Sequence, residues 1–359
     1  MKKFLFLLPL LAISSIGISG CKSSKKARIT YGTLVDTEAT ELDYGALAAK
    51  VAKKENLLIS VYQDGVPCGC WTTFKSVIDQ YVDQYDTKIY YIKRSQFSDD
   101  SEKWGLTILN DTTEPTFALI KDGKKANEFV YGKDNKPLFT TLKGLREAIV
   151  KIARDPQYML VDQSYLDKAL FVDKNDKVVV HYIWNFCPDC NDCFPNVLLP
   201  YSEKNEFKTK VWVIDLGIKG ILLDAEGKFI GTGIQTYVDF LKNHKMSKEG
   251  DETFGYDRGF VPTTQVWEKG ELKDMTVYFN DAVSLENDKY TITRSYYDPD
   301  RVKNLQYTSE VLLGRELPKE EIDATTNKET GVTTYSWNAE YARKTHQKIL
   351  ESFLNTYVK

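Results

Sequence analysis

The order of helical and strand patterns in this chain occurs twice, and that repeat restricts the fold more than any other feature. Each copy has the order helix, strand, cysteines, helix, strand, hairpin, helix. The ranges predicted for the first copy are 43–56, 57–62, 74–85, 88–93, 115–132 and 138–153. Those predicted for the second are 164–171, 177–184, 196–205, 210–216, 262–279 and 339–358. Strands that alternate with helices predict an α/β fold in which helices flank each sheet.

The first twenty residues have the pattern of a secretory signal. Lys2 and Lys3 precede an apolar stretch from Phe4 to Ile18, which is short for a membrane span. The stretch ends in ISGC, which resembles the lipobox of bacterial lipoproteins. The resemblance implies cleavage before Cys21, a lipid on its sulfur, and an extracytoplasmic protein anchored to the bacterial cell membrane. The alternative is an ordinary signal peptide with a cysteine there by chance.

We therefore expect a signal peptide at 1–20, a tether with the first strand at 21–40, and domains at 41–155 and 156–359. A chain of 359 residues has the length of about two domains. The second domain is longer because it contains two insertions, between Leu216 and Pro262 and between Phe279 and about Trp337. The first insertion has a hairpin pattern at 221–233 and a helical pattern at 236–244. The sequence indicates no role for either insertion.

Apart from Cys21, the chain has five cysteines in two tight clusters. A disulfide-stapled secreted fold has an even number of cysteines spread along the chain, so the clustering indicates chemistry. The stretch WNFCPDCNDCF at 184–194 contains three of them, each three residues from the next. This spacing is typical of a redox pair with a third thiol, of a metal site or of a structural disulfide.

A metal centre is short of ligands. A structural zinc site needs four ligands, and a ferredoxin-type run needs a fourth cysteine followed by proline. The chain has three histidines, none spaced as a partner of the cysteines: His181, His244 and His346. We predict no bound metal, and copper(I), which accepts fewer soft ligands, is the metal to test first.

Cys187 and Cys190 form a C-x-x-C sequence directly after a predicted strand and at the start of a predicted helix. The unpaired N–H groups of a helix N-terminus stabilise a thiolate, and the first cysteine is nearer to that end. We therefore assign Cys187 as the nucleophile and Cys190 as the thiol that resolves the mixed disulfide. Cys193 is either a small buried residue, which we favour, or a second resolving thiol.

This order of elements, with the cysteines opening a helix, resembles the thioredoxin-like superfamily. The resemblance implies two thioredoxin-like domains, each a central mixed sheet flanked by helices, the second with insertions. Pro195 matches the family's helix-kinking proline, and Pro262 matches its cis-proline. The backbone of Val261 would then lie beside the cysteines and pair with an extended substrate. Phe186 flanks the same site.

Three positions depart from the family pattern. His181 occupies the place of a buried acidic residue that shuttles protons. It is either an ordinary strand histidine with its hydrogen bonds satisfied, which we favour, or a proton shuttle, since a neutral imidazole could do the same work. In the first copy the cysteines are Cys68 and Cys70, with Trp71 where the family has its second cysteine. Pro115 nevertheless matches the cis-proline position. This copy is either a second redox site, since a C-x-C disulfide is strained and readily reduced, or a non-catalytic domain.

The sequence thus predicts an extracytoplasmic, membrane-anchored thiol–disulfide oxidoreductase that acts on protein disulfides through the CPDC dithiol. No cofactor is needed, since the dithiol is the redox centre. The expected partners are cysteine-containing envelope proteins, a redox donor or acceptor protein, and the membrane through the lipid anchor. Nucleic acid is not expected, because the net charge is −3 and no basic stripe occurs. The alternative is a non-catalytic surface binding lipoprotein that uses the folds as scaffolds and binds a soft metal such as copper.

Overall fold

The computed structural model describes residues 39–63, 69–85, 87–96, 114–184, 186–217, 221–222, 235–247, 250, 259–278, 281–296 and 312–359. The predicted signal peptide, Cys21, Cys68 and most of the hairpin predicted at 221–233 lie outside these residues. Within them, no helix has both the length and the apolar character needed to cross a membrane.

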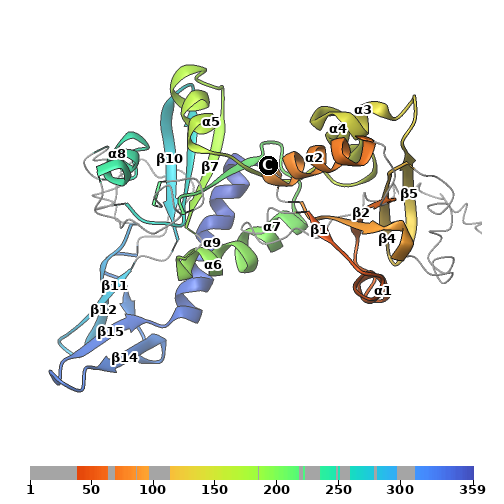
Figure 1. The fold of residues 1–359 in the computed structure, drawn as a ribbon. Coiled ribbons are helices and arrows are strands. Elements are labelled where there is room, and N and C mark those ends of the chain that lie inside the picture. The colour runs from red at the N-terminus through yellow and green to blue at the C-terminus, as the bar shows by residue number, and fades with distance from the viewer. Residues whose placement is uncertain are drawn as a thin grey trace, which may run out of the picture.

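Five strands form the sheet of the first domain (Figure 1). In spatial order they are β1 (Thr40–Glu41), β3 (Ile89–Lys93), β2 (Leu57–Tyr62), β4 (Thr116–Lys121) and β5 (Lys124–Val130). β1, β3 and β2 run parallel to one another. β4 is antiparallel to β2, and β5 is antiparallel to β4, so the sheet is mixed as expected.

Helices cover both faces of this sheet because successive strand side chains alternate between the faces. Leu57, Ile59 and Val61 of β2 belong to a buried cluster with α1 (Tyr44–Ala52). Leu58 belongs to the opposite cluster, with α2 (Gly69–Gln84), α3 (Lys136–Thr140) and α4 (Leu142–Ile152). A short 3₁₀ turn at Arg94–Gln96 follows β3.

The sheet of the second domain has the same plan. Its strands, in spatial order, are β6 (Tyr158–Leu160), β8 (Val211–Asp215), β7 (Val178–Ile183), β9 (Thr263–Glu268) and β10 (Glu271–Val277). β6, β8 and β7 are parallel, and β9 and β10 are antiparallel to their neighbours. The two mixed sheets therefore confirm the repeat that the sequence predicts.

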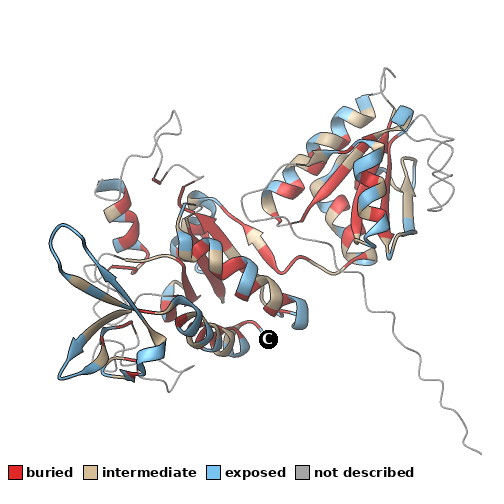
Figure 2. Ribbon diagram, turned by 90° about the horizontal axis from the view of Figure 1, so that it is seen from below, coloured by how far each residue is buried: buried red, intermediate tan, exposed pale blue. Residues whose placement is uncertain are grey.

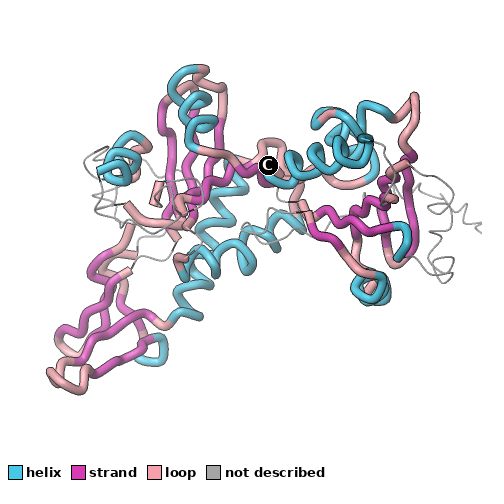
Figure 3. The backbone as a smooth tube through the Cα atoms, viewed as in Figure 1, coloured by secondary structure: helices cyan, strands magenta, loops and turns pink. Residues whose placement is uncertain are grey.

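Helical segments pack around the second sheet. They are α5 (Gln163–Asp167) with a π-helical turn at Lys168–Val172, α6 (Pro188–Cys193), a π-helical turn at Phe194–Leu198, α7 (Leu199–Lys204), α8 (Gln235–Asn243) and α9 (Ala339–Tyr357). α6 and α7 form one helical segment with Pro195 in the π turn between them. This segment runs beside α9 (Figure 3), and the hydroxyl of Tyr201 on α7 donates to Asn355 on α9 at 2.8 Å.

The second insertion forms two small antiparallel sheets that the sequence did not predict. One contains β11 (Ala282–Glu286), β12 (Lys289–Arg294) and β13 (Glu316–Leu317), and the other contains β14 (Ile322–Thr326) and β15 (Thr333–Trp337). A 3₁₀ turn at Lys319–Glu321 precedes β14. Most residues of β14 and β15 are exposed, in contrast to the buried strands of the two main sheets (Figure 2).

Local chemistry explains where the predicted boundaries hold and where they fail. Both hairpins turn where expected, at Asp122–Gly123 and Lys269–Gly270, where all four residues have positive φ. The single helix predicted at 138–153 is wrong, because Thr141 is extended and ends α3. Its side-chain oxygen accepts a hydrogen bond from the N–H of Gly144 and so starts α4.

The two domains are connected by the short segment between the end of α4 and the start of β6. Tyr85, which follows α2, forms an isolated antiparallel bridge with Met159 of β6. Arg154 donates to the carbonyl oxygen of Ser202 at 2.9 Å, and Asp155 pairs with Lys210 at 2.6 Å. The residues between the domains are therefore held mainly by contacts with the second one.

Candidate active site

The CPDC pair lies where β7 leads into α6. Cys187 is the N-cap residue of α6, and Pro188 occupies its first turn, where a missing N–H costs nothing. Cys187 is partly exposed, whereas the side chain of Cys190, one turn later, is buried. The N–H of Trp184 donates to the sulfur of Cys190 at 3.4 Å. Both cysteines are free thiols, and only the first one is accessible to a partner.

The two thiols differ in acidity. A hydrogen bond from the thiol of Cys190 lowers the pKa of Cys187 to about 7, helped by the N–H groups of Cys190 and Asp189. Burial and the Asp189 carboxylate oppose this effect. Burial raises the pKa of Cys190 well above its usual range, and its hydrogen bond to Cys187 adds to the shift. Near neutral pH the thiolate of the pair therefore forms at Cys187, the accessible position.

Cys193 is completely buried, as the favoured interpretation of the sequence expects. Burial, followed by the carboxylates of Asp192 and Asp189, raises the pKa of its thiol. A buried, neutral thiol is a poor nucleophile. Cys193 therefore fits a packing role better than that of a second resolving thiol.

The loop before β9 lies against the nucleophile. The Val261–Pro262 peptide bond is cis, as the resemblance implied, and the sulfur of Cys187 lies 3.5 Å from the carbonyl oxygen of Val261. Phe186 is 65% exposed beside the cysteines and makes an edge contact with Trp184, with ring centroids 6.1 Å apart. An exposed aromatic ring and a strand-leading backbone thus border the accessible sulfur.

His181 is buried in β7, and its Nδ1 lies 2.8 Å from the hydroxyl of Thr264. Its Nε2 has no hydrogen-bond partner within the described residues. Burial lowers the pKa of His181 to about 3. Desolvation therefore keeps this imidazole neutral near pH 7, and a role for His181 as a proton shuttle stays a prediction.

The first domain has a different chemistry at the equivalent place. Cys70, in the first turn of α2, is disulfide-bonded, and its partner lies outside the described residues. Trp71 stacks on Tyr62 with ring centroids 4.1 Å apart. Pro115 precedes β4 as Pro262 precedes β9. The expectation of a cis bond at Pro115 is wrong, however, since the cis peptide bond of the described chain is the one at Pro262.

A polar anchor that sequence reasoning missed fixes the end of α6. Asp192 accepts a hydrogen bond from Nε of Arg343 on α9 at 2.9 Å and forms an ion pair with Nη2 of the same side chain at 2.8 Å. The hydroxyl of Tyr278, just after β10, also donates to Asp192 at 2.9 Å, as does Asn196 at 3.0 Å. The helix that follows Cys187 and contains Cys190 and Cys193 is therefore tied to α9 and to the sheet.

Within the described residues, no three His, Cys, Asp or Glu side chains are grouped so that they could hold a metal ion. The sulfur of Cys187 faces the loop before β9, while Cys193 is buried in the core. The cysteines of the motif thus have different surroundings and do not form one ligand set.

No protein-family model matches the chain. Among solved structures, it is similar to a mutant thioredoxin from Halobacterium salinarum, with 18% identity over 34% of this chain and 97% of that one and a TM-score of 0.26. It is also similar to reduced Schistosoma mansoni thioredoxin pre-protein, with 19% identity over 32% of this chain and 98% of that one and a TM-score of 0.24.

A third similar structure is human ERp44, with 15% identity over 50% of this chain and 44% of that one and a TM-score of 0.24. The chain's own topology, and not these likenesses, establishes the fold: each domain has a mixed five-stranded sheet with helices on its faces and cysteines at a helix start. The chain thus contains two such α/β domains, as the resemblance to the thioredoxin-like superfamily implied.

Proposed function

We propose that this chain is a thiol–disulfide oxidoreductase whose second domain exchanges disulfides with other proteins through Cys187 and Cys190. The observation that supports this most is the contrast between the two thiols. Cys187 is accessible at a helix N-terminus with a pKa near 7, whereas Cys190 behind it is buried and protonated. That division of roles is the one that disulfide exchange requires.

The reaction begins when the thiolate of Cys187 attacks one sulfur of a substrate disulfide. A Cys187–substrate disulfide forms, and the other substrate sulfur leaves as a thiolate that takes up a proton. Cys190 then loses its proton and attacks the sulfur of Cys187, releasing the second substrate thiol. Two electrons have passed to the substrate, and the Cys187–Cys190 disulfide must be reduced by a dithiol protein. The steps also run in reverse, so the partner's potential sets the direction.

The loop before β9 is the proposed binding edge for the substrate chain. The carbonyl oxygen of Val261 lies next to the attacking sulfur, so an extended peptide pairing with Val261 would place its own disulfide at Cys187. The exposed ring of Phe186, next to Cys187 in the chain, offers an apolar contact for the substrate.

The lipobox-like sequence supports a place for this activity outside the cytoplasm, with Cys21 lipidated and the domains tethered to the membrane. The substrates would be cysteine-containing proteins of the cell envelope, and a second redox protein would renew the dithiol. The first domain, whose Cys70 is disulfide-bonded, would act as a second redox site if Cys68 is the partner of Cys70.

The reduction potential of Cys187–Cys190 tests this proposal. The Cys193→Ala protein would be equilibrated in glutathione redox buffers, and the fraction of Cys187–Cys190 disulfide followed by thiol labelling. We expect a potential between about −120 and −270 mV, the range of exchange-active dithiols. A potential well below about −300 mV would mark a structural disulfide and support the binding lipoprotein instead.

A further inference from the structure

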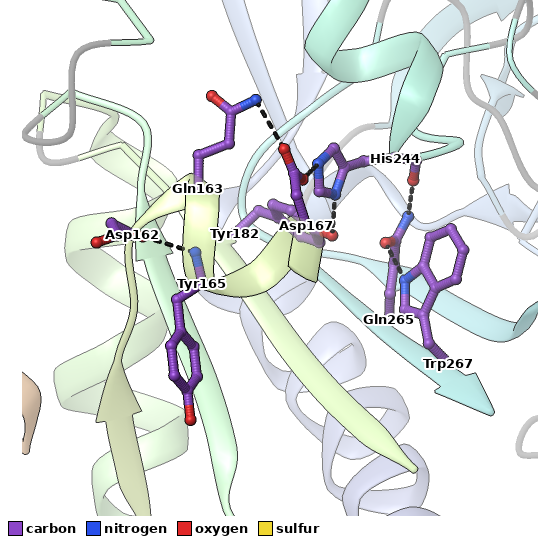
Figure 4. A network of polar contacts seen from close by, with 8 residues as sticks. All are labelled: Asp162, Gln163, Tyr165, Asp167, Tyr182, His244, Gln265 and Trp267. Carbon is purple, nitrogen blue, oxygen red and sulfur yellow. Dashed lines mark hydrogen bonds and ion pairs between the residues drawn. The ribbon is translucent and has the colours of Figure 1, made fainter. Parts of the chain in front are cut away.

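A buried histidine fixes the turn that closes helix α8 to three other elements of the second domain (Figure 4). His244, which is 1% exposed, lies 2.9 Å from the carboxylate of Asp167 on α5 through Nε2 and 3.0 Å from the hydroxyl of Tyr182 on β7 through Nδ1. The side chain of Gln265 on β9 donates to the carbonyl oxygen of His244 at 2.8 Å. The side chain and the backbone of His244 thus attach the end of α8 to α5, β7 and β9.

The partners of His244 indicate which ring nitrogen carries the proton. A carboxylate can only accept a hydrogen bond, so the Nε2 atom of His244 donates to Asp167. When the imidazole is neutral, its Nδ1 atom is an acceptor and accepts from the hydroxyl of Tyr182. Both nitrogens of this buried ring have a partner in that arrangement. An apolar residue at this position would remove both hydrogen bonds and loosen the end of α8.

The turn that His244 fixes contacts the loop that leads to the cis-proline. Leu241 and Met246 are the two ends of this turn, and the N–H of Met246 donates to the carbonyl oxygen of Leu241 at 2.8 Å. A Cβ atom placed on Gly259 would lie 3.0 and 3.1 Å from the two terminal carbons of Leu241 and 3.3 Å from the carbonyl oxygen of Met246. Both ends of the turn therefore lie against Gly259, and His244 lies between them in the chain.

The same loop reaches the nucleophile. Val261 follows Gly259 by two residues, and its carbonyl oxygen lies 3.5 Å from the sulfur of Cys187. The loop then enters β9, where Gln265 binds the backbone of His244, so this histidine is linked to the loop on both sides of the cis-proline. Within the described part of the chain, no hydrogen bond or ring contact joins His244 to a cysteine. An effect of His244 on the reaction would therefore pass through the loop.

We propose that His244 is a positioning residue for the edge that binds a protein substrate. It holds the turn after α8 against Gly259 and thereby keeps the backbone of Val261 beside the sulfur of Cys187. This inference rests on the proposed function. A protein disulfide needs this edge, because its extended chain pairs with Val261. A small disulfide without a peptide backbone needs only the sulfur of Cys187, so His244 favours protein disulfides as substrates.

The test compares a protein disulfide with a small one. Reduced wild type, His244→Ala and His244→Gln would be mixed with insulin or with hydroxyethyl disulfide, and loss of the Cys187 thiol followed by labelling. His244→Ala should lower the second-order rate constant with insulin about threefold to tenfold, the effect of losing about one hydrogen bond to the substrate. Its rate constant with hydroxyethyl disulfide should change by less than about twofold. His244→Gln should recover part of the loss, because its amide N–H can still donate to Asp167.

Asp167→Ala gives the same comparison if His244→Ala does not fold, because the side chain of Asp167 is 37% exposed and its removal does not open the core. It should lower the rate constant with insulin and spare the one with hydroxyethyl disulfide. The matched control is Asp173→Ala, which removes a half-exposed carboxylate 3.9 Å from Lys168, just after the same helical segment. This control should leave both rate constants unchanged.

Three results would overturn the inference. Equal losses with the two disulfides would show that His244 acts on the cysteines or on the whole fold. An unchanged rate with insulin in both His244→Ala and Asp167→Ala would show that the edge does not depend on this contact. A pKa of Cys187 that moves away from about 7 in His244→Ala, read from its alkylation rate, would place the effect on the thiol. If the wild type reacts with neither disulfide, the proposed function itself fails.

Discussion

The hydrogen bond between the two thiols of the CPDC pair leads to the most specific prediction. In the wild type, Cys187 has a pKa of about 7, and the hydrogen bond from Cys190 is the largest cause. Replacing Cys190 with Ala removes this bond and leaves only the backbone N–H groups as support. The pKa of Cys187 should therefore rise by about one unit or more, toward the usual value of roughly 8.5.

The size of this pKa shift determines how much of Cys187 is thiolate and therefore how fast it reacts at a given pH. At pH 7 about half of the wild-type Cys187 is thiolate, whereas a thiol with a pKa near 8.5 is only about 3% ionised. The more basic thiolate is also the better nucleophile, with a Brønsted slope of about 0.4 to 0.5, which offsets part of the loss. A single rate at pH 7 would thus understate the change, and the midpoint of the full pH profile reports it directly.

The assay is the rate of iodoacetamide alkylation of Cys187 between pH 5 and 10, read by mass spectrometry of the labelled peptide. Cys193→Ala is the matched control, because Cys193 is buried and is not among the causes of the shift at Cys187. Its midpoint should stay near 7. A midpoint near 7 in Cys190→Ala would refute the reasoning, since the helix terminus alone would then account for the acidity.

Three further predictions concern positions around the pair. His181 has a pKa of about 3 in the folded protein and about 6.5 in the unfolded chain. Between about pH 6.5 and pH 3 the unfolded chain therefore binds more protons than the folded protein, so the free energy of unfolding falls as the pH is lowered through this range. Lowering the pH from 7 to 5 should reduce the unfolding free energy measured in urea titrations by about 2 kcal/mol, and His181→Gln should not show this decrease. The same decrease in His181→Gln as in the wild type would contradict the assignment. Asp192→Ala removes the contact with Arg343 and should lower the unfolding free energy by about 1 to 3 kcal/mol. Its control, Glu340→Ala, removes an exposed ion pair with Lys344 and should lower the unfolding free energy by less than about 0.5 kcal/mol. Equal effects of the two variants would show that Asp192 does not stabilise the fold more than an exposed ion pair does. Gly259→Ala should lower both the rate of insulin reduction and the thermal stability, because the added Cβ would contact Leu241 of α8 and the residue has a φ of +80°. A variant with unchanged activity and stability would show that the loop and α8 can move apart at this position.

The repeat and the redox pair could be predicted from sequence because their signals are local. Alternating apolar patterns, Gly at the hairpin turns and C-x-x-C after a strand all lie within short stretches of chain. The break at Thr141 is equally local. The sequence KPLFTTLKG contains a second threonine that competes with it as a cap, so the pattern alone did not separate α3 from α4.

The rest of the site depends on contacts between distant parts of the chain. Arg343 and Asp192 are 151 residues apart, and neither position shows a pattern that points to the other. Helix α8 lies in an insertion, where the sequence indicates only a helix and not its contacts. The low pKa of His181 could not be predicted from the sequence, because it follows from complete burial, which a strand pattern indicates only in part.

Trapping of mixed disulfides tests the central claim most directly. Full-length Cys190→Ala protein would be expressed in cells and its disulfide-linked complexes separated under non-reducing conditions, with Cys187→Ala as the control. We expect Cys190→Ala to accumulate complexes with envelope proteins that disappear on reduction, while the control forms none, because Cys187 attacks and Cys190 resolves. Equal amounts of complexes in the two variants, or none in either, would contradict the assignment of Cys187 as the nucleophile.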